Sequence, residues 1–189
     1  KRELKVKSAG YSGTLDPFAT GTLLIATDGA SRLFNYVELE PKRYRATLWL
    51  GAKSETLDIE GATTIEEAPI FELSDIQKTI TDLKDISTIT PPKYSAKRVD
   101  GKRAYELARA DKEVRLKECA IKVFDAKLIL YSHPFVTFEV SVSKGAYVRT
   151  LGEIAANKLG IPGSLSFLER LSEGGFKKKK KKELDIRAS

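Results

Sequence analysis

The residue of this chain best placed to do chemistry is Asp16, within the segment GTLDPFATG at residues 13–21. Glycine and proline surround it, as in tight turns, and the apolar run 23–26 follows, so we expect a structured loop that leads into a buried strand or helix. A carboxylate on such a loop can act as a nucleophile or a base. The local pattern by itself favours a plainer role, in which Asp16 accepts hydrogen bonds from nearby backbone amides.

Two further segments contain side chains that could bind or react. Residues 90–109, TPPKYSAKRVDGKRAYELAR, combine tyrosines with many basic side chains. Basic groups for phosphates and aromatic rings for unstacked bases are typical of looped RNA recognition, although a solvated surface loop and helix would look the same. In residues 143–151, SKGAYVRTL, Arg149 follows an expected strand. Its side chain could point into a cleft, or face water at the start of a helix.

Composition narrows the possible classes of protein. The 189 residues carry a net charge of +7, but without the six lysines at 177–182 this falls to +1 (7 − 6), so any nucleic-acid site must be locally basic. The single cysteine excludes an intramolecular disulfide, which suits a reducing cytoplasm. One cysteine and one histidine are too few ligands for a conventional zinc site. No apolar run approaches the ~20 residues that span a bilayer, and no signal peptide is visible.

The elements that must position these residues alternate between strands and helices. Residues 42–50, KRYRATLWL, alternate apolar and polar side chains, which predicts a strand with Tyr44 on its apolar face. We expect a helix over 74–83 with Ser74 as its N-cap, strands over 120–131 and 135–143 joined by a turn at 132–134, and a helix over 150–158. This order favours an α+β fold with a mixed, mostly antiparallel sheet.

Taken together, these segments resemble the TruB family of tRNA pseudouridine synthases, which modify uridine 55 in the T loop. The matching stretches keep the family's order and cover most of the chain: SAGYSGTLDPFATGTLLIATDGASRL (8–33), KRYRATLWLGAKSETLDIEG (42–61), TPPKYSAKRVDGKRAYELAR (90–109), SKGAYVRTLGEIAANKLG (143–160) and SLSFLERLSEGGF (164–176). The resemblance implies the pseudouridine synthase fold, a central sheet flanked by helices and loops. It divides the chain into a catalytic domain at 1–176 and a basic tail at 177–189. It also implies a short form, without the family's usual N-terminal strand or C-terminal RNA-binding domain.

The resemblance also assigns roles to individual residues. Asp16 matches the catalytic aspartate, Tyr44 the tyrosine that lies against the target base, and Arg149 the arginine that pairs with the aspartate. Leu168 matches an apolar residue of the pocket, and Tyr11 stands where the family usually has histidine and is expected to contact RNA. The segment 90–109 resembles the family's RNA-gripping loop, with these expected contacts: Lys93, Tyr94, Lys97, Arg98, Lys102 and Arg103.

The expected reaction needs neither a metal nor an organic cofactor, because it breaks and remakes one bond with no redox change or hydrolysis. The expected partner is the T stem-loop of tRNA, with no membrane and no obligate protein partner, in the cytoplasm. Two alternatives stay open: a related pseudouridine synthase that acts on another RNA, and a non-catalytic RNA-binding module. The second explains the basic segment but gives Asp16, Tyr44 and Arg149 no role.

Overall fold

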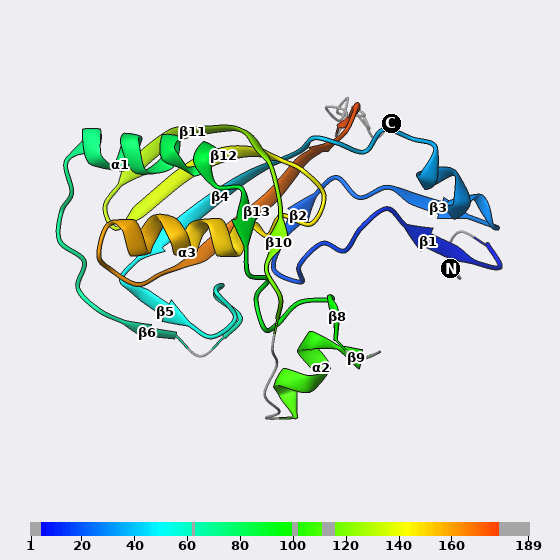
Figure 1. Cartoon of the computed structure of the whole chain (residues 1–189), viewed down its shortest axis with the longest axis horizontal. Coiled ribbons are helices and arrows are strands. Elements are labelled where there is room, and N and C mark those ends of the chain that lie inside the picture. The colour runs from blue at the N-terminus through cyan, green and yellow to red at the C-terminus, as the bar shows by residue number, and fades with distance from the viewer. Residues whose placement is uncertain (1–4, 62, 100–101, 111–115, 178–189) are drawn as a thin grey trace, which may run out of the picture.

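A single mixed sheet forms the centre of the molecule. The computed structural model describes residues 5–61, 63–99, 102–110 and 116–177. Five strands pair antiparallel in the order β11 (Val123–Ser132), β12 (Phe135–Val142), β4 (Lys42–Leu50), β13 (Gly163–Glu173) and β14 (Phe176–Lys177) (Figure 1). The short β2 (Thr20–Gly21) joins β13 in parallel. The predicted α+β class with a mixed, mostly antiparallel sheet is therefore confirmed.

The strand β4 explains which face of the sheet is buried. Its alternating pattern is confirmed: Tyr44, Ala46, Leu48 and Leu50 are buried, and the side chains between them are more exposed. The helices α1 (Leu73–Thr81) and α3 (Val148–Lys158) lie against the buried face (Figure 1). On the other face, the ring of Trp49 packs 5.5 Å from that of Phe135.

Three predicted boundaries need correction. The helix α1 has Glu72, not Ser74, at its N-cap, because the carbonyl of Glu72 already accepts the first helical bonds, and the chain continues beyond α1 as the 3-10 turn η2 (Asp82–Asp85). The helix α3 begins at residue 148 rather than 150, since the amide of Leu151 already bonds to the carbonyl of Tyr147. The strand expected over 120–131 is divided, because β10 (Cys119–Ala120) pairs with β7 (Thr88–Ile89) and not with the main sheet.

The apolar run 23–26 is not the buried element that the sequence predicts. It enters β3 (Ile25–Thr27), which pairs with β1 (Ala9–Tyr11) in a two-stranded ribbon beside η1 (Ala30–Asn35), extending away from the main sheet (Figure 1). Leu23 is 38% exposed and Ile25 is 58% exposed. A two-stranded ribbon has too little neighbouring structure to cover its own apolar side chains.

Two small units complete the described chain. The pair β5 (Ala52–Ser54) and β6 (Thr63–Ile65) follows β4, and the pair β8 (Arg98–Val99) and β9 (Lys102–Arg103) leads into α2 (Ala104–Arg109) on a projection from the body (Figure 1). None of the described helices is long and apolar enough to cross a membrane. Of the lysine run, Lys177 belongs to β14, and residues 178–182 lie outside the described part of the chain.

Candidate active site

The loop that carries Asp16 is anchored to the main sheet at its C-terminal end, where β2 pairs with β13. The amide of Ala19 bonds to the carbonyl of Asp16 at 2.9 Å, which closes a tight turn. Gly21 then pairs with Arg170 of β13 in a left-handed conformation, with φ at +108°. A β-carbon on Gly21 would lie 2.3 Å from the carbonyl oxygen of Arg170, so only glycine allows this close approach.

Arg149 holds both oxygens of the Asp16 carboxylate. Its Nε donates to Oδ2 at 2.9 Å and its Nη2 donates to Oδ1 at 2.9 Å, so the contact is bidentate. The Arg149 side chain is 4% exposed at the start of α3, and that of Asp16 is 27% exposed. The interpretation that Arg149 faces water at the start of a helix is therefore wrong. The plainer role for Asp16 is wrong too, since among the described residues no backbone amide donates to its carboxylate.

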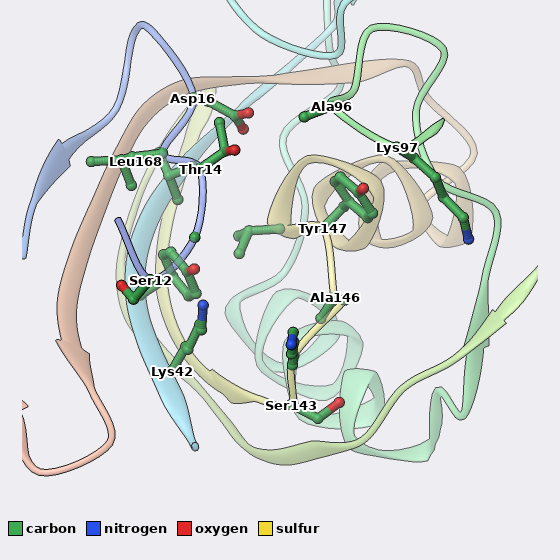
Figure 2. Close-up of a pocket in the computed structure, with 16 residues that line it drawn as sticks. Ser12, Thr14, Asp16, Lys42, Ala96, Lys97, Ser143, Ala146, Tyr147 and Leu168 are labelled. Carbon is green, nitrogen blue, oxygen red and sulfur yellow. The ribbon is translucent and has the colours of Figure 1, made fainter. Parts of the chain in front are cut away.

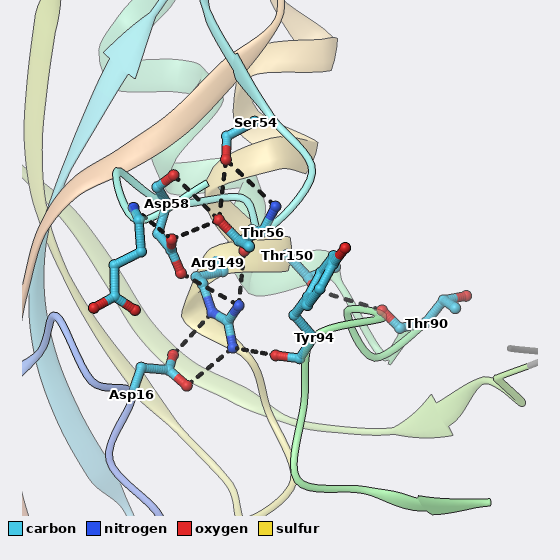
Figure 3. A network of polar contacts seen from close by, with 9 residues as sticks. Asp16, Ser54, Thr56, Asp58, Thr90, Tyr94, Arg149 and Thr150 are labelled. Carbon is cyan, nitrogen blue, oxygen red and sulfur yellow. Dashed lines mark hydrogen bonds and ion pairs between the residues drawn. The ribbon is translucent and has the colours of Figure 1, made fainter. Parts of the chain in front are cut away.

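Arg149 is itself fixed from behind (Figure 3). Its Nη1 donates to the carbonyl of Thr56 at 2.7 Å and lies 3.4 Å from Oδ2 of the buried Asp58, and its Nη2 also donates to the carbonyl of Tyr94 at 3.1 Å. Asp58 accepts from the Thr56 hydroxyl at 2.6 Å and from the Glu60 amide at 3.0 Å. One guanidinium is thus shared by two carboxylates. Sequence reasoning missed Asp58, because nothing in its local pattern shows that it is buried.

The Asp16 carboxylate lies on the wall of a cavity of about 310 Å³ (Figure 2). Tyr44 from β4 and Leu168 from β13 contribute an aromatic ring and an apolar side chain, and Tyr147 lies on the other side. Burial raises the pKa of the Tyr44 phenol and that of Tyr147, so both stay uncharged near neutral pH. Such a cavity suits a flat, largely uncharged ring that enters beside a carboxylate.

The other predicted residues are distributed around this cavity. Lys97 lines it, Lys93 is exposed, and Tyr94 donates its hydroxyl to Glu55 at 3.3 Å. Tyr11, 53% exposed on β1, is not among the lining residues. Arg98, Lys102 and Arg103 belong to β8 and β9, and their side chains lie outside what the structure describes.

The cavity also contains residues that sequence reasoning missed. Lys42 and Ser12 line it, and both contact the buried Glu173. Lys42 stands two positions before Tyr44 on β4, so the period of a strand could have placed it on the same face. No comparable pattern points to Glu173. The described residues contain no group of three His, Cys, Asp or Glu side chains arranged to hold a metal ion.

Comparison with known proteins identifies the family. The model of the TruB family pseudouridylate synthase (N terminal domain) matches residues 1–148. This chain belongs to the TruB family. The tRNA pseudouridine synthase B of Sulfurimonas denitrificans is 52% identical over 190 residues, covering the whole of this chain and 70% of that protein. The protein of the same name from Helicobacter hepaticus is also 52% identical, over 92% of this chain and 61% of its own length.

Solved structures support the same fold. A chain in the crystal structure of a Cbf5-Nop10-Gar1 complex matches with a TM-score of 0.68 at 24% identity, over 95% of this chain and 44% of that chain. A chain of an H/ACA RNP bound to a substrate RNA containing 2′-deoxyuridine matches with a TM-score of 0.65 at 23% identity, over 95% of this chain and 43% of its own. The fold predicted for this TruB family chain agrees with both.

Proposed function

We propose that this chain isomerises uridine 55 to pseudouridine in the T loop of tRNA, with Asp16 as the reacting carboxylate. The bidentate contact between Arg149 and Asp16, on the wall of a cavity lined by Tyr44 and Leu168, carries the proposal. Membership of the TruB family and relatives named tRNA pseudouridine synthase B support it. A non-catalytic RNA-binding module would have no use for a carboxylate held in this way.

The chemistry requires the uridine to leave the base stack, because its glycosidic bond cannot be reached within a helix. The uracil ring would lie against Tyr44 and Leu168. The C1′–N1 bond breaks, the ring turns within the cavity, and C5 joins C1′, while C5 loses a proton and N1 gains one. The Asp16 carboxylate can attack the base, attack the sugar or accept a sugar proton. Arg149 donates to both oxygens of this carboxylate and so holds it in one orientation on the cavity wall.

The substrate would be gripped by the segment that borders the cavity. Lys97 lines the cavity and Lys93 is exposed, so both can reach phosphates of a T stem-loop. We assign the same role to Arg98, Lys102 and Arg103, and contacts with bases to Tyr94 and Tyr11. The proposed site of action is the cytoplasm.

Release of tritium from uridine labelled at C5 tests this function, because forming the C5–C1′ bond expels that hydrogen. We expect release from a T-stem-loop hairpin and from whole tRNA, and none with Asp16→Asn, which keeps the shape but not the charge. Release only from a different RNA would favour the related synthase. RNA binding without release from any RNA would favour the binding module.

A further inference from the structure

A second ion pair adjoins the same cavity, on the wall that carries Ser12 and Lys42 (Figure 2). Lys42 Nζ lies 2.7 Å from Oε1 of Glu173, and the Ser12 hydroxyl donates to Oε2 of Glu173 at 2.6 Å. The Glu173 side chain is inaccessible to solvent and that of Lys42 is 11% exposed. Glu173 therefore lies beneath the cavity wall, while Lys42 remains open to it.

The charges of this cluster do not cancel. Arg170, also inaccessible, lies with Nη2 3.9 Å from Oε2 of Glu173, so two cations share one carboxylate. Arg170 is bonded to the chain on both sides of Asp16. Its Nε donates to the Thr22 carbonyl at 2.7 Å, and its Nη2 donates to the Gly13 carbonyl at 3.5 Å. The ammonium of Lys42 has three donors, and the described residues offer it Glu173 as its one ion-pair partner. The Lys42 ammonium is nearly buried and has N–H groups beyond the one that faces Glu173, so an acceptor that enters the cavity would satisfy them.

The backbone leaves room for this ammonium. A β-carbon on Gly13 would lie 2.9 Å from Lys42 Nζ, so any larger residue there would push the ammonium aside. Lys42 and Tyr44 are two residues apart on β4 and share its inner face. A ring that lies against Tyr44 is therefore next to Lys42 in the same cavity.

We infer that Lys42 is a further catalytic residue, which donates a hydrogen bond to a carbonyl oxygen of the departing uracil, and that Glu173 is the residue that positions it. This inference rests on the proposed function. As the C1′–N1 bond breaks, its electron pair passes to the uracil ring and is shared by N1 and the two carbonyl oxygens. C1′ receives an electron pair from an Asp16 oxygen, from the C2′–H bond when Asp16 takes that proton, or from the ribose ring oxygen when Asp16 has added to the base. Lys42 keeps its own proton and stabilises the charge that develops.

The experiment measures the single-turnover rate at saturating T-stem-loop RNA, the Kd for that RNA and the thermal midpoint of each variant. Lys42→Met should lower the rate by about 10²-fold, as the loss of one preorganised donor does elsewhere, with Kd within about 3-fold of the parent. Lys42→Arg should recover part of the rate. Glu173→Gln should lower the rate by about 10-fold, because the ammonium is no longer held in place.

The double variant K42M/E173Q separates catalysis from folding, because it leaves one cation, Arg170, without a carboxylate, where Glu173→Gln leaves two. We expect its thermal midpoint to recover above that of Glu173→Gln, while its rate stays as low as that of Lys42→Met. A rate that recovers together with the midpoint would overturn the inference, as would a Lys42→Met rate near that of the parent. Glu139→Gln is the matched control, since Glu139 pairs with Arg45 at 2.7 Å on the opposite face of β4. It should keep the full rate. An inactive parent would instead refute the proposed function.

Discussion

At the scale of single residues, replacing Arg149 by lysine tests whether its hydrogen-bonding geometry matters beyond its charge. Arg149→Lys keeps the positive charge but cannot bond both oxygens of Asp16 while also reaching the carbonyls of Thr56 and Tyr94. We expect at least a 10²-fold loss of the single-turnover rate, with a small change in RNA affinity. Lysine is the sharper test, because Arg149→Ala would also leave Asp58 buried without its cation and so destabilise the fold.

The result that would contradict this assignment is a lysine variant that reacts as fast as the parent. Circular dichroism and thermal unfolding of the same preparation should show a folded protein. If the folded Arg149→Lys variant is slow, the cause is the poor orientation of Asp16, because the lysine still supplies a positive charge beside it.

At the scale of elements, β8, β9 and α2 project from the body within the segment 90–109, which should set the salt dependence of RNA binding. Replacing its basic residues by glutamine should flatten the plot of log Kd against log salt by about one unit for each phosphate that is no longer bound. The residues to change together are Lys93, Lys97, Arg98, Lys102 and Arg103. Lys78 and Lys84, on or next to α1, serve as the control pair and should leave the slope unchanged. An unaltered slope after the fivefold change would remove this segment from the RNA interface.

The sequence predicts those elements that show a regular alternation of apolar and polar residues. It does not predict burial or contacts that depend on residues far away in the chain. Nine alternating residues were enough to define β4 and its buried face. The run 23–26 was misjudged, because a short apolar stretch does not reveal whether anything covers it. Ser12 and Glu173 are 161 positions apart, so no window of sequence could show their contact. The role of Arg149 came from the resemblance alone, and its catalytic part in this chain stays a prediction.

At the scale of the whole molecule, two buried carboxylates should make stability depend on acid. Burial raises the pKa of Glu173 and of Glu139, but their partners outweigh it, chiefly Lys42 with Ser12 for Glu173 and Arg45 for Glu139, so both pKa values fall below the ordinary 4.5. An acid with a lowered pKa in the folded state stabilises the fold above its unfolded pKa and loses that effect as pH falls through its folded value. Stability should therefore decline as pH drops below about 4.5.

Urea unfolding of the parent, Glu173→Gln and Glu139→Gln between pH 7 and pH 3 checks this dependence. Each variant should start from a lower midpoint and lose less of it in acid than the parent does. Burial raises the pKa of Glu153, which acts in the opposite direction, so the total decline is smaller than two carboxylates alone would give. Parallel curves for all three proteins would contradict the assignment.

The position of Trp49 gives this protein a built-in optical probe. It is the one tryptophan of the chain, and it packs on Phe135 on the face of β4 that points away from Tyr44 and the cavity. Its emission should therefore stay nearly constant when RNA occupies the cavity, and shift to longer wavelength when β4 and β12 separate. Fluorescence can thus follow unfolding in the presence of substrate, without a label and without interference from binding.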